Sequence, residues 1–247
     1  MELIVIFKKL LPGTVKSRLR PHLPSWLKAR VEDARAFVGT DETSGRFQFE
    51  LLQREGCRPT SKVLEIGCGN LHAGVLLIQF LEKGHYVGLD PNEWLRRSRM
   101  RDQGVRRLVR DKQARFLSTH DFDASSLQMK FDFVLSHSVL SHCAHWQLEQ
   151  YLQNTAKVLA PGGRIVASIR LAEGNTFGST GSPDKRDSMD KIWQYPDVSW
   201  FELATVTRVA SQCGLTVTQR PEYTELFMTR PQMGEVHDWL VFVRKGT

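Results

Sequence analysis

The sequence predicts an α/β fold built on a doubly wound, mostly parallel sheet. Three observations lead to this prediction. Short apolar runs alternate with segments of helical periodicity from about residue 60 onward. The first run, Val63–Ile66, ends in the turn Gly67-Cys68-Gly69, where glycines let the backbone turn and approach a ligand closely. The next run ends in Asp90, at a distance from the turn that lets a carboxylate reach ribose hydroxyls from a second strand.

The chain divides into an appendage and a domain. Residues 1–45 carry prolines at 12, 21 and 24, which break them into short pieces, so we expect a basic N-terminal helical appendage with one helix over about 25–38. Residues 46–247 form the predicted domain. Within it, residues 171–199 are non-periodic and rich in Gly, Ser, Asp and Lys, which is typical of a lid insertion over a substrate site.

In the first half of the domain, three strands alternate with helices. Apolar residues recur at helical spacing after the Gly-Cys-Gly turn, and Gly84 is the stop signal of that helix. The next helix carries many arginines, and the strand after it is short. We expect helices over about 46–56, 71–83 and 93–103, and strands over about 62–67, 85–90 and 114–117.

The second half continues the same alternation. The turn Pro161-Gly162-Gly163 separates a helix with leucines on one face from an apolar strand, and Gly214 ends a later helix. We expect helices over about 146–159 and 200–213, and strands over 131–136, 164–169, 215–219 and 239–244.

Composition limits the class of protein. The chain has 247 residues and is 41% hydrophobic, enough for one large domain or a domain with an appendage. It has no apolar run long enough to span a membrane, and its first residues do not read as a signal peptide. Its 4 cysteines are scattered, so we expect free thiols, no metal site and a reducing, cytoplasmic location.

Basic residues cluster in two stretches of a chain whose net charge is +7. One stretch runs from Lys8 to Arg30, and the other holds nine Lys or Arg between Arg96 and Arg115. Such clusters attract phosphates, acidic glycans or anionic lipid head groups, and a peripheral position at the inner face of the membrane is one outcome. A solvated helix face that binds no partner explains them equally well.

The turn favours one of two cofactor classes. A nicotinamide fingerprint, G-x-G-x-x-G, requires a third glycine where this chain has His72. The pattern E-x-G-x-G from Glu65 instead resembles motif I of class I S-adenosylmethionine-dependent methyltransferases. The F-D-x-V run from Phe131 and the L-x-P-G-G-x-I-V run from Leu159 resemble the central part of that family, over about residues 60–170. The resemblance implies a Rossmann-like, seven-stranded sheet with an antiparallel last strand.

The same resemblance implies cofactor roles for particular residues. Those around the turn would line the methionine end of S-adenosylmethionine, Asp90 with Pro91 would hold the ribose, Asp121 with Phe122 would meet the adenine, and Ser136 would close the pocket. A solvated loop acid is the alternative for Asp121. The residues assigned to the methionine end are Glu65, Gly67, Cys68 and Gly69.

Residues 136–145 are the richest in titratable groups and follow a strand's carboxyl end, where α/β sites lie. Their form S-V-L-S-H resembles a segment of bacterial small-molecule and sugar methyltransferases. His142 is the first candidate for a general base, because neutral imidazole suits that role near pH 7, and His137 is the second. His142 serves equally well as a residue that packs against or caps the following helix.

A narrower resemblance concerns the acceptor. The runs Gly67–Gly74 and Gly88–Leu95 resemble bacterial methyltransferases found with glycan and cell-envelope biosynthesis enzymes, with His72 in place of an arginine and Asn70 in place of a serine. The leading interpretation is methyl transfer to a hydroxyl group, and secondarily to an amine, of a saccharide or other small metabolite. The basic clusters suit an acceptor that is acidic or lipid-linked. A nucleic-acid methyltransferase and a non-catalytic, membrane-tethering module are the alternatives.

Overall fold

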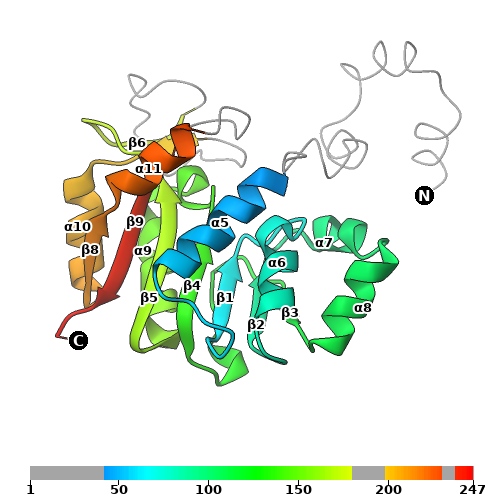
Figure 1. Cartoon of the computed structure of the whole chain (residues 1–247). Coiled ribbons are helices and arrows are strands. Elements are labelled where there is room, and N and C mark those ends of the chain that lie inside the picture. The colour runs from blue at the N-terminus through cyan, green and yellow to red at the C-terminus, as the bar shows by residue number, and fades with distance from the viewer. Residues whose placement is uncertain (1–41, 180–197, 230–236, 247) are drawn as a thin grey trace, which may run out of the picture. The chain divides into compact units, whose positions relative to one another are not determined.

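A computed structural model describes residues 42–179, 198–229 and 237–246 of the chain (Figure 1). Its centre is a seven-stranded sheet in the order β3-β2-β1-β4-β5-β9-β8. Neighbours from β3 to β5 pair in parallel, and β9 runs antiparallel to both β5 and β8. The α/β class, the parallel centre and the antiparallel last strand are therefore confirmed. The predicted appendage helix and the basic stretch from Lys8 to Arg30 lie outside the described residues.

The strands lie close to where the apolar runs predict them, except that β5 begins at Leu159 and includes the expected turn at 161–163. Buried strands of a parallel sheet read as continuous apolar runs, because helices cover both faces. All four residues of β1 and of β2 are buried. The strands of the large sheet are β1 (Val63–Ile66), β2 (Tyr86–Leu89), β3 (Arg115–Leu117), β4 (Phe131–Ser136), β5 (Leu159–Ile169), β8 (Leu215–Gln219) and β9 (Asp238–Arg244).

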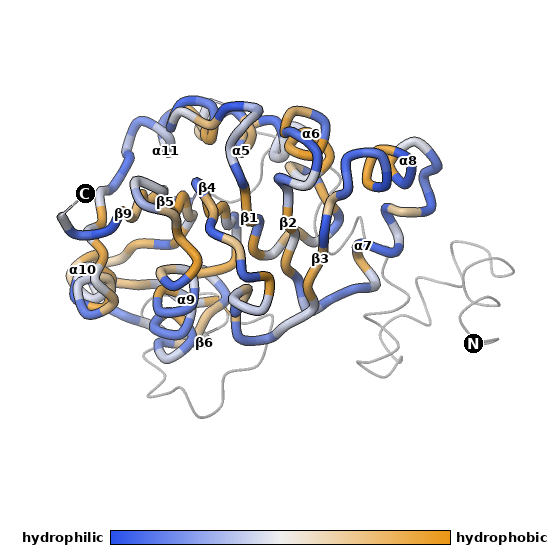
Figure 2. Tube along the Cα trace, turned by 90° about the horizontal axis from the view of Figure 1, so that it is seen from below, coloured by the Kyte–Doolittle hydropathy of each residue, from blue (hydrophilic) through white to orange (hydrophobic). Residues whose placement is uncertain are grey.

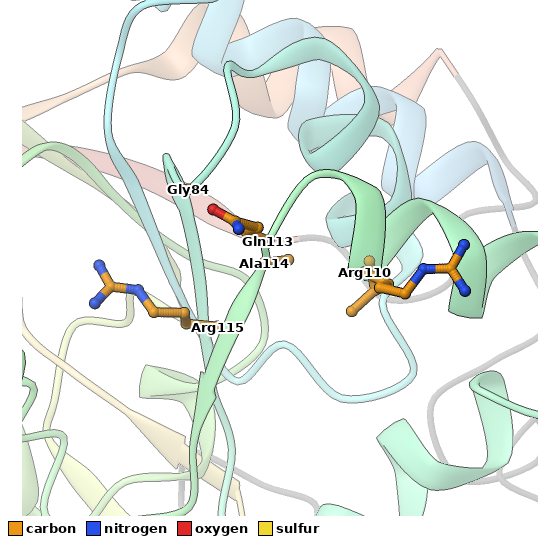
Figure 3. Close-up of a pocket in the computed structure, with 6 residues that line it drawn as sticks. Gly84, Arg110, Gln113, Ala114 and Arg115 are labelled. Atoms are coloured by element: carbon orange, nitrogen blue, oxygen red, sulfur yellow. The ribbon is translucent and has the colours of Figure 1, made fainter.

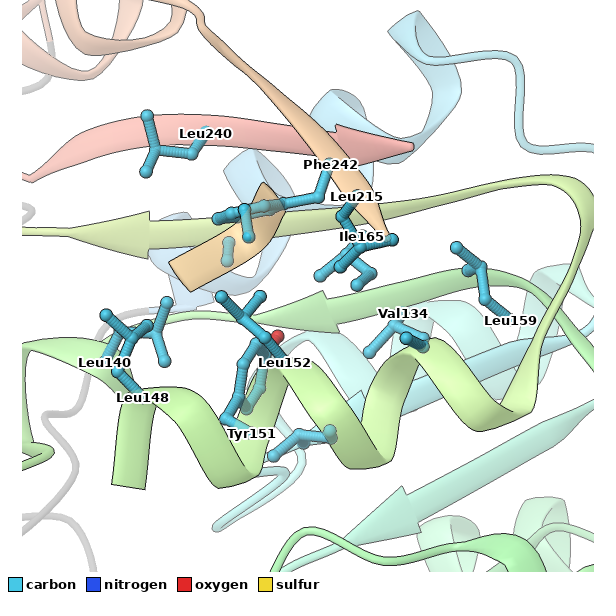
Figure 4. Close-up of a cluster of buried hydrophobic side chains, with 14 of the residues drawn as sticks. Val134, Leu140, Leu148, Tyr151, Leu152, Leu159, Ile165, Leu215, Leu240 and Phe242 are labelled. Atoms are coloured by element: carbon cyan, nitrogen blue, oxygen red, sulfur yellow. The ribbon is translucent and has the colours of Figure 1, made fainter. Parts of the chain in front are cut away.

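Helices cover both faces of the sheet, as the view along it shows (Figure 2). The helices are α5 (Glu42–Arg54), α6 (His72–Phe80), α7 (Glu93–Arg99), α8 (Gln103–Asp111), α9 (His145–Val158), α10 (Leu203–Gln212) and α11 (Pro221–Met228), with short 3₁₀ turns at Ser125–Leu127 and Leu140–His142. Residues of α5, α6, α8 and α11 share one hydrophobic core with the strands. Residues of α9 and α10 share the other, in which Leu148 of α9 lies beside Leu140 (Figure 4).

Three helix predictions differ from the structure. The basic helix expected over 93–103 ends at Arg99, and an unpredicted helix, α8, follows it; the Asp102 side chain accepts the backbone N–H of Val105 at 3.0 Å and starts α8. Helix α5 begins at Glu42, before residue 46, where it was expected to start. Helix α11 was not predicted; Pro221 stands in its first turn, where a missing N–H is tolerated.

Part of the expected insertion is an antiparallel ribbon. Strand β6 (Thr176–Ser179) pairs with β7 (Val198–Trp200), so Trp200 belongs to a strand and not to the start of α10. Residues 180–197 lie outside the described residues, and a lid over 171–199 stays a prediction.

Candidate active site

The turn after β1 requires its glycines. Gly67 and Gly69 have φ of 73° and 44°, a left-handed conformation that side chains disfavour. A Cβ on Gly67 would lie 2.4 Å from Cγ2 of Val139, so the turn is pressed against the segment that follows β4. The two loops therefore meet at the carboxyl edge of the sheet, between neighbouring parallel strands.

Asp90 ties this turn to the loop after β2. Asp90 is 6% exposed, and its Oδ2 accepts the N–H of Gly69 at 2.9 Å while Oδ1 accepts the N–H of Asn92 at 2.7 Å. Each carboxylate oxygen has a second lone pair for another donor. Asp90 is thus fixed beside the turn, and the exposed Pro91 follows it.

Behind the turn lies a buried acid–phenol pair. The Tyr86 hydroxyl donates to Glu65 Oε2 at 2.5 Å, and a Cβ on Gly74 would lie 2.6 Å from that hydroxyl. Burial raises the pKa of Glu65 to about 8, with a smaller contribution from the charge of Asp90. Glu65 is therefore mainly protonated at neutral pH. Burial also raises the pKa of the Cys68 thiol, which keeps it protonated and unreactive.

The loop after β3 is tied to α9. The side chain of Asp121 is exposed and accepts from the Thr119 hydroxyl at 2.6 Å and from the N–H of Asp123 at 3.1 Å. The Thr119 hydrogen bond, more than any charge, lowers the pKa of Asp121. The Asn154 side chain donates to the Asp121 carbonyl at 2.7 Å, which holds the loop in place.

Phe122 and Ser136 both lie on Tyr151 of α9. Phe122 has a φ of 62° and meets the Tyr151 ring edge-on, with centroids 5.5 Å apart. The Ser136 hydroxyl is fully buried and lies 2.6 Å from the Tyr151 hydroxyl. Burial raises the pKa of Tyr151, so this pair stays neutral. Ser136 is thus connected to Phe122 through Tyr151, which contacts both residues.

The two candidate bases lie on the segment that adjoins the Gly67 turn. His137 is half-buried, and burial lowers its pKa to about 4, with a smaller effect from His72. His142 ends the 3₁₀ turn and is half-buried. The first turn of α9 is closed by Gln147, whose Oε1 accepts the N–H of Ala144 at 2.9 Å. The N-cap residue of α9 is Ala144 and not His142.

Sequence reasoning missed His237 and Trp239. Trp239 of β9 stacks on His137 with ring centroids 5.5 Å apart and 7° between the planes, and His237 lies 5.4 Å from His137. They reach the site because β9 runs antiparallel to β5, so its first residues lie where β5 ends. A histidine just before an expected last strand was the one available signal.

The comparisons agree with this geometry. Residues 64–165 match a family model described as a methyltransferase domain. The chain is similar to a TehB-like SAM-dependent methyltransferase from Corynebacterium glutamicum, at 20% identity and a TM-score of 0.52, over 81% of this chain and 88% of that one. These matches identify residues 64–165 as a methyltransferase domain.

Two further solved structures share the fold of this methyltransferase. Magnesium protoporphyrin IX methyltransferase from Synechocystis, solved with bound SAM, is 16% identical with a TM-score of 0.56, over 96% of this chain and 100% of that one. An O-methyltransferase family protein from Burkholderia thailandensis is 13% identical with a TM-score of 0.55, over 88% of this chain and 60% of that one. Class I methyltransferases use S-adenosylmethionine (SAM) as the methyl donor.

The residues present in the methyltransferase fit that cofactor. The turn at Gly67 admits only glycine, since a Cβ there would clash with Val139. Beside it, Asn70 is 8% exposed, and its Oδ1 has no hydrogen-bond partner among the described residues. Asp90 is fixed at the end of β2 with lone pairs to spare. The binding roles of Glu65, Gly67, Cys68, Gly69, Asp90, Pro91, Asp121, Phe122 and Ser136 stay predictions.

A hollow of about 590 Å³ lies away from these residues (Figure 3). It lies at the amino edge of the sheet, between the end of α8 and the starts of β2 and β3. Its lining residues are Gly84, Val109, Arg110, Gln113, Ala114 and Arg115. The side chains of Arg110 and Arg115 point in opposite directions, so they do not converge on a ligand. In α/β sheets, sites lie at the carboxyl edge, and we assign this hollow no role in catalysis.

Two absences hold for the part of the chain that the structure describes. Within it, no three His, Cys, Asp or Glu side chains are grouped so that they could hold a metal ion. No helix there is long and apolar enough to cross a membrane.

Proposed function

We propose that this methyltransferase transfers a methyl group from S-adenosylmethionine to a hydroxyl oxygen of a saccharide or other small metabolite. The observation that carries the proposal is the contact between Gly67 and Val139. It sets the segment with His137 and His142 against the turn proposed to line the methionine end. A proton acceptor next to the methyl donor is what a hydroxyl nucleophile needs, because its oxygen must lose a proton as it bonds to carbon.

In this proposal the chain mainly positions the reactants. When bound, S-adenosylmethionine supplies an electrophilic methyl carbon on a sulfonium. Asp90 orients the ribose hydroxyls, the backbone at Gly67 and Gly69 admits the methionine end, and Phe122 covers the adenine. Holding the acceptor oxygen in line with the methyl carbon accounts for most of the acceleration expected from such a site. His142 or His137 then takes the hydroxyl's proton.

The test is turnover measured as release of S-adenosylhomocysteine with separate acceptor pools: monosaccharides, phenols, amines and transfer RNA. We expect release with a hydroxyl pool and a fall in kcat of about a hundredfold or more when the histidine that acts as base is changed to alanine. His120→Ala, in the exposed loop after β3, is the matched control. Transfer confined to amines would contradict the proposal.

The basic surface favours a second candidate. Arg101, Arg106, Arg107 and Arg110 are exposed on and before α8. Methyl transfer to RNA or DNA that weakens steeply with salt would support a nucleic-acid methyltransferase. Binding of this surface to anionic vesicles would instead support an acidic or lipid-linked acceptor, with the protein cytoplasmic and peripheral to the membrane. Cofactor binding without transfer to any pool would favour a non-catalytic module.

A further inference from the structure

Three ring side chains form a cluster at the carboxyl edge of the sheet. His137 follows β4, Trp239 pairs with Ser168 near the end of β5, and His237 precedes β9. The His137 ring stacks on Trp239 at 7° and is tilted 52° from His237, with centroids about equally distant. The His137 imidazole therefore lies next to both the Trp239 indole and the His237 imidazole.

One ring nitrogen of each residue in this cluster is buried and unsatisfied. His137 Nε2, His237 Nδ1 and Trp239 Nε1 make no hydrogen bond with any residue that the structure describes. His237 is 5% exposed and Trp239 is fully buried. Buried polar groups are nearly always hydrogen-bonded, and each orphan group destabilises the fold. Three orphan nitrogens in one cluster therefore indicate a place that a polar group other than the described residues fills.

The chemistry of the cluster suits a hydroxyl. Burial lowers the pKa of both histidines, and the neighbouring His72, His142 and Arg170 act in the same direction. Neutral imidazole has one nitrogen that donates and one that accepts. A hydroxyl also donates and accepts, whereas a carboxylate only accepts. Among these three neighbours only Arg170 is permanently charged, and its guanidinium lies over the Trp200 ring, 5.4 Å from the ring centroid.

We infer that His137 and His237 together bind the acceptor's hydroxyl group, one imidazole accepting its proton and the other donating to its oxygen. The inference rests on the proposed function and names the group of the acceptor that the site recognises. As the oxygen–carbon bond forms and the carbon–sulfur bond breaks, the hydroxyl's proton moves to the accepting imidazole nitrogen. His237 is thereby a second catalytic residue, contributed by a segment far from His137 in the sequence.

The test uses two probes of similar shape, phenol and benzoate, on the full chain saturated with S-adenosylhomocysteine. Histidine side-chain signals are followed by ¹H–¹⁵N NMR during each titration. We expect phenol to shift the signals of His137 and His237 and to leave His85, at the amino edge of the sheet, unchanged. Benzoate is expected to shift neither. Stronger binding of benzoate, or no shift with phenol, would overturn the inference.

Two variants assign the effect to the pair. His237→Phe keeps a ring but removes both nitrogens, so we expect phenol affinity to fall about tenfold. His237→Gln replaces the imidazole with an amide that also donates and accepts, and it is the variant to use if His237→Phe does not fold. Its loss of phenol affinity should be smaller than that of His237→Phe. His85→Phe is the matched control. S-adenosylhomocysteine affinity should be the same in all variants, so a failure to bind it at all counts against the proposed function and not against the histidine pair.

Discussion

Asp90 joins two loops through a single carboxylate. Its oxygens accept the N–H groups of Gly69 and Asn92, so the turn after β1 and the loop after β2 are set relative to each other before any ligand arrives. Such pre-organisation lowers the cost of ordering the site on binding.

The Glu65–Tyr86 pair gives the first prediction at this scale. Tyr86→Phe removes the donor to a buried carboxyl, so we expect the free energy of unfolding to fall by about 1–3 kcal/mol. Urea unfolding of Tyr86→Phe, Glu65→Gln and the double variant measures the coupling between the two residues. Additive losses would show that the hydrogen bond contributes nothing.

Glu65 also predicts a pH dependence. Its pKa is raised from an ordinary 4.5 to about 8 by burial, so the folded chain binds the proton more tightly than the unfolded chain. The contribution of Glu65 to the free energy of unfolding is fully present below pH 4.5. It is lost as pH rises through 8, which lowers the free energy of unfolding by up to about 5 kcal/mol. Urea unfolding across this range should show a fall that Glu65→Gln flattens. An equal fall in that variant would mean that Glu65 is already ionised at neutral pH.

At the scale of elements, the Gly67 turn depends on both backbone and packing. Gly67→Ala adds left-handed strain of about 1–2 kcal/mol and a clash with Val139. We expect at least a tenfold loss of S-adenosylhomocysteine affinity by calorimetry, partly restored by adding Val139→Ala. Gly84 has a similar φ of 78°, but a Cβ added there would meet open space. Gly84→Ala should therefore strain the backbone without weakening the binding of S-adenosylhomocysteine. Equal affinity of Gly67→Ala and the native chain would contradict the role of this turn.

Asp102 predicts a local effect. Its side chain caps α8, so Asp102→Ala should lower the free energy of unfolding by about 1 kcal/mol. Hydrogen exchange should accelerate in α8, with Asp111→Ala at the other end of the helix as the control. Unchanged exchange in α8 would show that Asp102 does not hold this helix start.

The elements differ in how far the sequence predicts them. Strands such as β4 were predictable because burial on both faces makes their apolar runs continuous. Helix α8 was missed because one side-chain cap, at Asp102, starts it within a run of uniform basic composition. The approach of His237 to His137 could not be read from the sequence, since it follows from the pairing of β9 with β5.

At the scale of the molecule, buried histidines predict loss of stability in acid. Burial lowers the pKa of His137 from 6.5 to about 4, and that of His237 falls in the same direction. Their stabilising contribution is complete above pH 6.5 and is lost as pH falls through 4, by up to about 3 kcal/mol for His137. Urea unfolding between these values should show this loss and a smaller one in His137→Gln. A steeper loss in that variant would contradict the assignment.

The central claim is that the carboxyl edge around Gly67 and Asp90 binds S-adenosylmethionine, and calorimetric titration with S-adenosylhomocysteine tests it most directly. The native chain and Asp111→Ala, an exposed acid on α8, should bind with micromolar affinity. Asp90→Ala should bind at least tenfold more weakly while remaining folded by circular dichroism. Binding unaffected by Asp90→Ala, or no binding to the folded native chain, would contradict the account.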